Sequence, residues 1–167
     1  MKKTFIIALC CLTALLAACN KEKPNEKFVG DYEGSGVVNA TMTVAGIYPQ
    51  EFNDVDLPIK INIAAGDADN KVILTYINDE LDETYTATGT VNGNDIDFDP
   101  VTINTVVESY EVEATLDLDG SLSGNDLTLN GSVKGGGTFA QSGFQAPYTI
   151  EGTMTGTVTK IVVNVSE

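Results

Sequence analysis

The strongest constraint on the fold is a two-residue alternation of apolar and polar side chains along most of the chain after residue 28. Residues 110–118 show it most clearly, with apolar residues at even positions and mostly acids at odd positions. Successive side chains of a β-strand point to opposite faces, so the alternation predicts strands with one buried face. No stretch has a convincing helical periodicity. The sequence therefore predicts an all-β domain.

Turn signals divide these segments into eight expected strands. The strands are centred on residues 28–47, 57–63, 71–78, 84–91, 95–99, 110–119, 127–133 and 148–158. Pro100 is expected to mark an edge or bulge in the fifth strand, because proline cannot donate to a ladder. The segments Gly89–Phe98 and Gly120–Leu129 match nearly position for position, and both predict a strand, a tight turn and a strand.

Glycines recur inside the expected strands, where they permit the sharp coiling that a closed sheet needs. They are Gly34, Gly36, Gly89, Gly131, Gly152 and Gly156. We therefore predict an eight-stranded antiparallel up-and-down β-barrel in which the first strand pairs with the last. A two-sheet β-sandwich is the alternative fold.

The first 27 residues differ from the rest. Lys2 and Lys3 precede the apolar run 5–18, which is too short to cross a bilayer and fits a signal peptide. The run ends in Leu16-Ala-Ala-Cys19, which resembles the lipobox of bacterial lipoproteins. The resemblance implies that residues 1–18 are a signal peptide removed at Cys19, and that Cys19 is acylated. The alternative is an ordinary cleaved signal with a chance cysteine.

The resemblance also implies a location and a division of the chain. Residues 19–27 are polar, contain Pro24, and are expected to form a lipidated flexible tether to a barrel domain at 28–167. By analogy with enterobacterial lipoproteins, in which Asp after the cysteine favours inner-membrane retention, Asn20 favours the outer membrane. The membrane, through the lipid on Cys19, is the expected partner.

Charge and missing residue types exclude several functions. Beyond residue 18 the chain contains seven lysines and 24 acidic residues, and the whole chain has no Arg, His or Trp. Such a surface repels nucleic-acid backbones. Once Cys19 is acylated, no thiol or imidazole remains to act as a nucleophile, base or soft metal ligand. We therefore expect no catalytic residues, no cofactor and no nucleic-acid partner.

The segment Phe28-Val-Gly30-Asp-Tyr32-Glu-Gly34 resembles the opening of lipocalin-like (calycin-like) bacterial lipoproteins, in which a Gly-x-aromatic element begins the first barrel strand. Lipocalins proper have Trp at the aromatic position and an Arg of the last strand packed over it. Here Tyr32 replaces the Trp, and there is no Arg. The resemblance implies a cup closed at one end that binds a small apolar molecule in its lumen.

Ten residues are candidates for lining such a lumen and its mouth, because aromatic rings and methionines fit apolar ligands. They are Tyr32, Met42, Tyr76, Tyr85, Phe98, Tyr110, Phe139, Phe144, Tyr148 and Met154. The segments 47–56 and 135–147 are expected to be loops that could cover the mouth. Equally, the barrel could be filled by its own side chains.

The acidic pattern Asp95-x-Asp97-x-Asp99 fails as a calcium loop, because Pro100 stands where glycine is required and no bidentate Glu follows. Acidic turns at 67–70 and 78–83 could hold a weakly bound ion, but solvated surface acids are the simpler interpretation, and no metal site is predicted.

Two functional hypotheses remain. The first is a non-enzymatic, membrane-anchored barrel that binds a small apolar ligand. The alternative is an interaction module with a solid barrel that contacts protein or glycan through its loops.

Overall fold

The computed structural model describes residues 23–78, 82–107, 110–141 and 144–162. For residues 78, 104–107, 110–112, 139–141 and 144 the backbone alone is described. A short 3-10 helix, η1 (Glu26–Phe28), precedes nine strands. The strands are β1 (Gly30–Val44), β2 (Tyr48–Ala65), β3 (Lys71–Asn78), β4 (Glu83–Asn92), β5 (Asp95–Phe98), β6 (Val101–Val107), β7 (Tyr110–Ser123), β8 (Asp126–Gln141) and β9 (Phe144–Lys160).

The strands form one antiparallel sheet that closes on itself. Their order is β5-β4-β3-β2-β1-β9-β8-β7-β6, and an additional β5–β7 ladder completes a ring of eight strands. β1 pairs with β9 from Tyr32–Lys160 to Val44–Tyr148. The predicted all-β barrel with its first and last strands paired is therefore confirmed, and the sheet is not divided into a sandwich.

The count of strands differs from the prediction at Pro100. The expected fifth strand is two strands, β5 and β6. The backbone N–H of Asp99 still donates to the carbonyl of Thr88 on β4, at 2.7 Å, but Pro100 has no N–H with which to continue that ladder. Beyond it, β6 pairs with β7 along Val101–Val107. The chain therefore loses β4 as a neighbour at Pro100 and keeps β7, with which both β5 and β6 pair.

Both segments expected to be loops over the mouth belong to strands. Residues 48–56 are the first half of β2 and pair with β1, with a bulge where the register shifts between Val38 and Ala40. Residues 135–141 and 144–147 extend β8 and β9 as a hairpin. The expectation of two lids was wrong, because polar and glycine-rich composition does not prevent pairing when a neighbouring strand offers a free edge.

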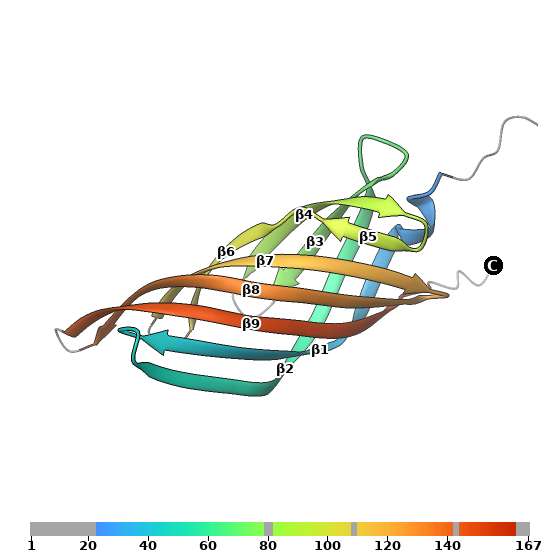
Figure 1. Cartoon of the computed structure of the whole chain (residues 1–167). Coiled ribbons are helices and arrows are strands. Elements are labelled where there is room, and N and C mark those ends of the chain that lie inside the picture. Colours follow the sequence, from blue (N-terminus) through green and yellow to red (C-terminus); the bar gives the residue numbers. More distant parts are fainter. Residues whose placement is uncertain (1–22, 79–81, 108–109, 142–143, 163–167) are drawn as a thin grey trace, which may run out of the picture.

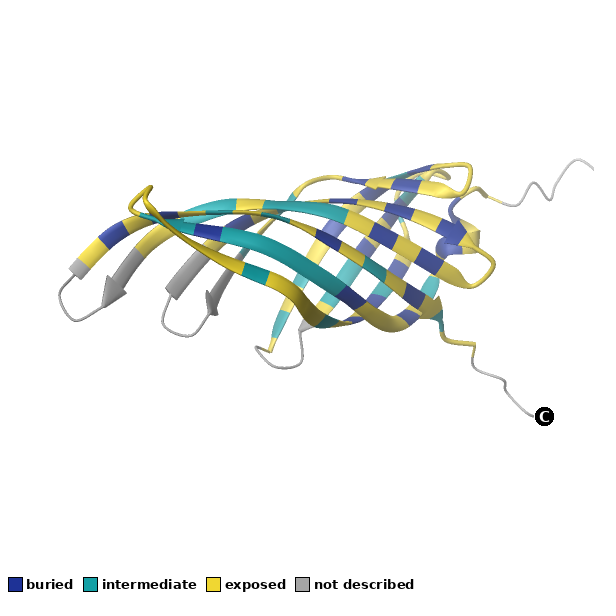
Figure 2. Ribbon diagram, turned by 60° about the horizontal axis from the view of Figure 1, so that its bottom comes forward, coloured by how far each residue is buried: buried dark blue, intermediate teal, exposed yellow. Residues whose placement is uncertain are grey.

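The wall of the barrel is much taller on one side than on the other (Figure 1). The tall side is formed by β1, β2, β7, β8 and β9, which have 14 to 18 residues each. β3 and β4, with 8 and 10 residues, form a short side. Along the strands of the compact end, buried and exposed residues alternate, as Figure 2 shows. The barrel therefore has an oblique mouth at the end opposite η1 and the end of β9.

The other end is closed by the N-terminal segment and a dense apolar core. Phe28 of η1 is fully buried, and its carbonyl accepts a 2.8 Å hydrogen bond from the Tyr32 hydroxyl. The buried Asn25 side chain donates to the carbonyls of Ala68 and Lys71. Together with an ion pair between Lys23 and Asp69, these contacts lie within the segment expected to be a tether. Figure 1 places this segment and the end of β9 at the same closed end.

Close backbone approach in the strongly coiled β1–β9 region depends on glycine. A Cβ on Gly34 would lie 2.1 Å from the Thr157 carbonyl oxygen and 2.8 Å from the Val158 Cα. These are backbone atoms, so the clash cannot be relieved by rotating a side chain. The glycine placement inferred from the sequence therefore has a steric cause at this position.

Replacing Gly34 with alanine should destabilise the barrel, because the added methyl overpacks against the β9 backbone. We expect a loss of about 2 kcal/mol in the free energy of unfolding, or several degrees in Tm. Ser35→Ala, at the neighbouring exposed residue, is the control and should change Tm by less than about 1 °C. Equal melting temperatures for Gly34→Ala and the native chain would show that the approach is looser than described.

The Tyr32 hydroxyl should make the closed end sensitive to alkali. Burial raises the pKa of Tyr32 from 10.0 to about 12. Below pH 10 the phenol is protonated in both states, but between pH 10 and 12 the unfolded chain ionises first. As the pH rises through this window, the free energy of unfolding therefore falls by about 2 to 3 kcal/mol.

Urea unfolding of the native chain and of Tyr32→Phe at pH 7.5 and 11.5 tests this expectation. At pH 7.5 the variant should be less stable by about 1 kcal/mol, because it lacks the hydrogen bond to Phe28. At pH 11.5 this difference should shrink or reverse. Tyr48→Phe removes an exposed hydroxyl and should leave the free energy at pH 7.5 unchanged. A difference between Tyr32→Phe and the native chain that is constant with pH would contradict the prediction.

Candidate ligand cavity

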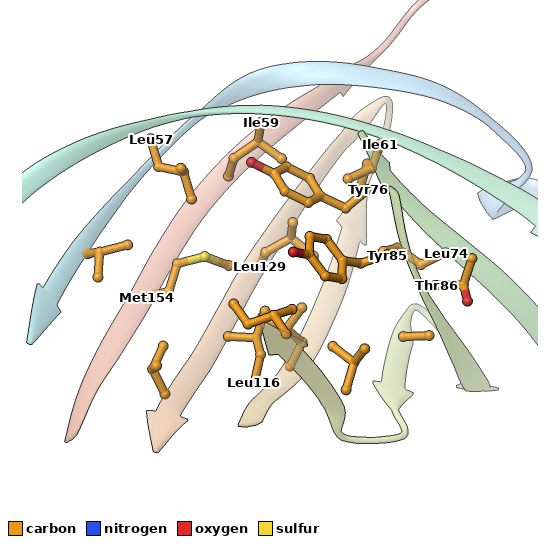
Figure 3. A pocket seen from close by; sticks show the side chains of 16 residues that line it. Leu57, Ile59, Ile61, Leu74, Tyr76, Tyr85, Thr86, Leu116, Leu129 and Met154 are labelled. Carbon is orange, nitrogen blue, oxygen red and sulfur yellow. The ribbon is translucent and has the colours of Figure 1, made fainter. Parts of the chain in front are cut away.

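A cavity of about 370 Å³ lies inside the barrel between the closed end and the mouth. Its wall takes residues from β1 to β4 and from β6 to β9, and Figure 3 shows their side chains converging on one space. The lining residues are Val38, Leu57, Ile59, Ile61, Leu74, Tyr76, Tyr85, Thr86, Ala87, Val101, Ile103, Leu116, Leu118, Leu129, Val133 and Met154. The volume falls at the lower end of the range for small-molecule sites.

The lining has almost no polar character. Apart from Thr86 and the two tyrosines, every lining side chain is aliphatic or a thioether, and none is charged. An apolar cavity of this kind favours molecules that bring little polar surface into it, because an unpaired polar group loses its hydration there. Neither a nucleophile nor an acid–base pair faces the space within the lining residues.

Two tyrosines form the most polar part of the wall. Tyr76 on β3 and Tyr85 on β4 are cross-strand partners, with ring centroids 6.5 Å apart and planes inclined by 18°. Figure 3 shows the two rings side by side within the cavity. Rings at this separation and angle form an offset stack, which gives the wall a rigid aromatic face.

Glu83 lies next to this pair. It precedes Tyr85 by two residues on β4, so both side chains share a face of the strand, and the Tyr85 hydroxyl donates to the Glu83 carboxylate. The pKa of Tyr85 is raised to about 12, first because burial disfavours the phenolate, and then through the hydrogen bond to Glu83 and the negative charge of Glu83, with a smaller contribution from Tyr76.

On the short side of the barrel the cavity lies between two strands, β4 and β6. β4 is paired with β5 only over Gly89–Asn92, and among the described pairings none joins β4 to β6. Lining residues nevertheless stand on both strands, Tyr85 and Ala87 on β4 and Val101 on β6. On this side the cavity wall is therefore formed by side chains of two strands that no described ladder joins.

A second apolar cluster extends the surface towards the mouth along the tall wall. Its buried members are Met42, Ala114 and Tyr148, with half-buried neighbours that include Ile103 and Val133 of the cavity wall. An apolar surface thus continues from the cavity along the inner face of the long strands.

Of the ten expected lining residues, Tyr76, Tyr85 and Met154 line the cavity. Tyr32 and Phe98 point inward, but they are packed in the closed end and are 1 % and 2 % exposed. Met42 and Tyr148 belong instead to the second apolar cluster. The alternation placed all of these on the inner face. It did not give their height along the barrel, which is set by register.

The remaining predicted site residues lie outside what is described. Cys19 precedes the described chain. Tyr110, Phe139 and Phe144 have backbone positions in β7, β8 and β9, but their side chains are not among those described.

Most of the cavity wall was missed by a search for aromatic residues and methionines. It is made by aliphatic residues, such as Ile59, Leu116 and Val133, which the same alternation had placed on inward faces. The inward phase of Glu83 also went unrecognised, because the fourth strand was expected to start one residue later. Extending the alternation back through Tyr85 would have revealed it.

Among the described residues, no three acidic, histidine or cysteine side chains come together as a group that could hold a metal ion. Over the same residues, no helix is long and apolar enough to cross a bilayer. The acidic turn at 67–70 uses one of its carboxylates in an exposed 3.1 Å ion pair between Asp69 and Lys23.

No protein-family model matches the chain, and no curated protein matches it. Among solved structures, the ywiB protein from Bacillus subtilis is similar at 12 % sequence identity and a TM-score of 0.30, over 79 % of this chain and 94 % of that one. At this TM-score the likeness carries no inference about fold or function. The functional argument therefore depends on the cavity itself.

Proposed function

We propose that this protein is a membrane-anchored lipoprotein with a lipocalin-like barrel that binds a small, largely apolar molecule without catalysing a reaction. The observation that carries the proposal is the 370 Å³ cavity with an apolar wall and a route to solvent. A barrel that served only to present its loops to a partner would gain stability from filling this space. Its persistence supports ligand binding over the interaction module with a solid barrel.

The size of the cavity limits the ligand. A cavity of about 150 Å³ lined by apolar side chains accommodates benzene, so 370 Å³ has room for roughly 15 non-hydrogen atoms. This corresponds to one or two rings, or to a short branched chain. A longer molecule would have to extend through the mouth along the apolar tall wall.

A contact at the closed end supports the resemblance to lipocalins. Lys160 of the last strand lies with its ammonium 5.9 Å from the centre of the Tyr32 ring, and it also donates to the carbonyl of Lys27 at 3.2 Å. In lipocalins proper, an Arg of the last strand covers the aromatic residue of the Gly-x-Trp element. The contact between Lys160 and Tyr32 is of the same kind, with a cation of the last strand over an aromatic ring of the first, and it supports this part of the proposal.

Anchoring through Cys19 would orient the barrel. Lys23, the first described residue, is held at the closed end by Asp69. Four residue steps separate it from Cys19, so an extended tether spans at most about 14 Å. The closed end then faces the membrane and the mouth faces away from it. The ligand would arrive from the aqueous side or from another protein rather than from the anchoring leaflet.

Lipidation can be tested directly in the native bacterium. The full chain should incorporate radiolabelled palmitate and fractionate with membranes, because several acyl chains on one residue give a nearly permanent anchor. Cys19→Ser should abolish labelling and release the protein into the soluble fraction. Cys11→Ser, within the expected signal peptide, is the control and should leave both unchanged. Palmitate labelling of Cys19→Ser would refute the assignment of the acylated residue.

Filling the cavity should abolish ligand binding while preserving the fold. Ala87 is buried and lines the cavity, so Ala87→Phe projects a ring into it. Binding of the neutral fluorescent probe 1-aminonaphthalene should weaken by at least about tenfold, because the probe and the new ring compete for one volume. Thr88→Phe, on the exposed face of the same strand, is the matched control and should bind as the native chain does.

Circular dichroism and thermal melting establish that both phenylalanine variants remain folded. Ala87→Leu fills less of the space and should have intermediate affinity. If the native chain bound neither the probe nor any small molecule carried through purification, the proposal of a ligand-binding barrel would fail. Equal probe binding by Ala87→Phe and Thr88→Phe would place the site elsewhere.

A further inference from the structure

One charged side chain shares the inner face of the barrel at its open end. Glu83 is two residues from Tyr85 and four from Ala87, and both of these line the cavity. The hydrogen bond from the Tyr85 hydroxyl fixes the Glu83 carboxylate on that same face. Glu83 is half-buried. The apolar cavity therefore has a carboxylate at its edge, beside an aromatic pair.

This placement differs from that of the other strand carboxylates. Outside the β2 bulge, the acids in described strand positions fall between inward residues and so face solvent; Asp117 and Asp119, for example, flank the buried Leu118. The inward-phase lysine, Lys160, is at the closed end over Tyr32. No described cation of the inner face therefore stands near Glu83 to neutralise it.

The carboxylate keeps capacity for a ligand. An ionised carboxylate can accept about four hydrogen bonds, and the Tyr85 hydroxyl supplies one of them. The rings of Tyr76 and Tyr85 add negative π faces, which attract cations near their centres. An ammonium nitrogen at this place would meet both attractions, whereas a carboxylate would meet the negative charge of Glu83 at close range.

We propose that the ligand is a cationic amphiphile, with an apolar body in the cavity and a positively charged nitrogen at Glu83 and the tyrosine pair. This inference rests on the proposed ligand-binding function and names the chemical class of its ligand. The cavity selects the apolar body by size, and Glu83 selects the head group by charge. Fatty acids and other anionic amphiphiles are rejected.

Three ligands with the same phenylbutyl body and different head groups test the proposal: 4-phenylbutylamine, 4-phenylbutanol and 5-phenylpentanoate. Each has fewer non-hydrogen atoms than the roughly 15 that the cavity accommodates. The protein is the chain from Cys19 onward with Cys19→Ser, which retains every described residue. Affinities are measured by calorimetry at pH 7 in 0.5 M NaCl, where a Debye length of about 4 Å screens the attraction of the acidic surface for any cation.

The amine should bind at least about tenfold more tightly than the carboxylate, with the alcohol between them. Glu83→Gln should reduce this ratio at least about tenfold, because the amide keeps the shape of the side chain and removes its charge. Glu113→Gln changes the net charge equally on an exposed residue of β7 and should leave the ratio within about twofold of the native value.

The outcomes separate the two proposals. If the alcohol binds but the amine is no tighter than the carboxylate, the charge selection is wrong and the ligand-binding function stands. An equal ratio in Glu83→Gln and Glu113→Gln would likewise remove Glu83 from the site. If none of the three ligands nor the neutral probe binds the native chain, the ligand-binding function itself fails. The ratio of amine to carboxylate affinity in the native chain tests the selection by charge even if Glu83→Gln does not fold.

Discussion

The hydrogen-bonded ladder between β1 and β9 is the interaction on which the rest of the structure depends. It joins the two ends of the sheet from Tyr32–Lys160 to Val44–Tyr148. Without it, the apolar faces of nine strands would belong to an open sheet with two free edges, a form prone to aggregation. The ladder requires close backbone approach in a strongly coiled region, and glycines such as Gly34 make that approach sterically possible. Coiling of the strands therefore allows the sheet to close, and closure in turn encloses the apolar face.

The two ends of the barrel differ because their strands end at different heights. At the closed end, short turns and the docked segment around Phe28 exclude water, and the core is dense. At the other end, Pro100 ends the β4–β5 ladder and leaves β4 and β6 without a common described pairing. Packing that supplies stability is concentrated at one end, and the space available to a ligand is concentrated at the other.

An unfilled apolar cavity has an energetic cost, because the residues that line it lose contacts that a filled core would provide. A protein tolerates this cost when a ligand recovers it on binding. A ligand that entered between β4 and β6 would break no described ladder, because none joins these two strands. Edge strands with few hydrogen-bonded neighbours are also the segments that open locally with the least free energy. The strands with the fewest described ladders therefore lie beside the cavity.

The sequence by itself determined the all-β class, the closure of first strand on last, the two related hairpins and the inward face of nearly every strand, because these follow from side-chain alternation and turn chemistry that are local. Tertiary structure alone decided the height of each inward residue. Tyr32, Phe98, Met42 and Tyr148 share their inward phase with Tyr76, Tyr85 and Met154, yet only the last three meet at the cavity.

Register between strands decides which residues share a level, and it depends on pairings between segments far apart in the chain. The same reason explains why residues 47–56 and 135–147 form strands rather than lids: their partners, not their composition, supply the ladder. It also explains why Glu83 was not recognised as a candidate site residue. Glu83 lies in phase with Tyr85 beside an apolar cavity, and that cavity is enclosed by several strands together. Local side-chain alternation determined whether each side chain points into the barrel or out of it, and long-range strand pairing determined which side chains become its neighbours.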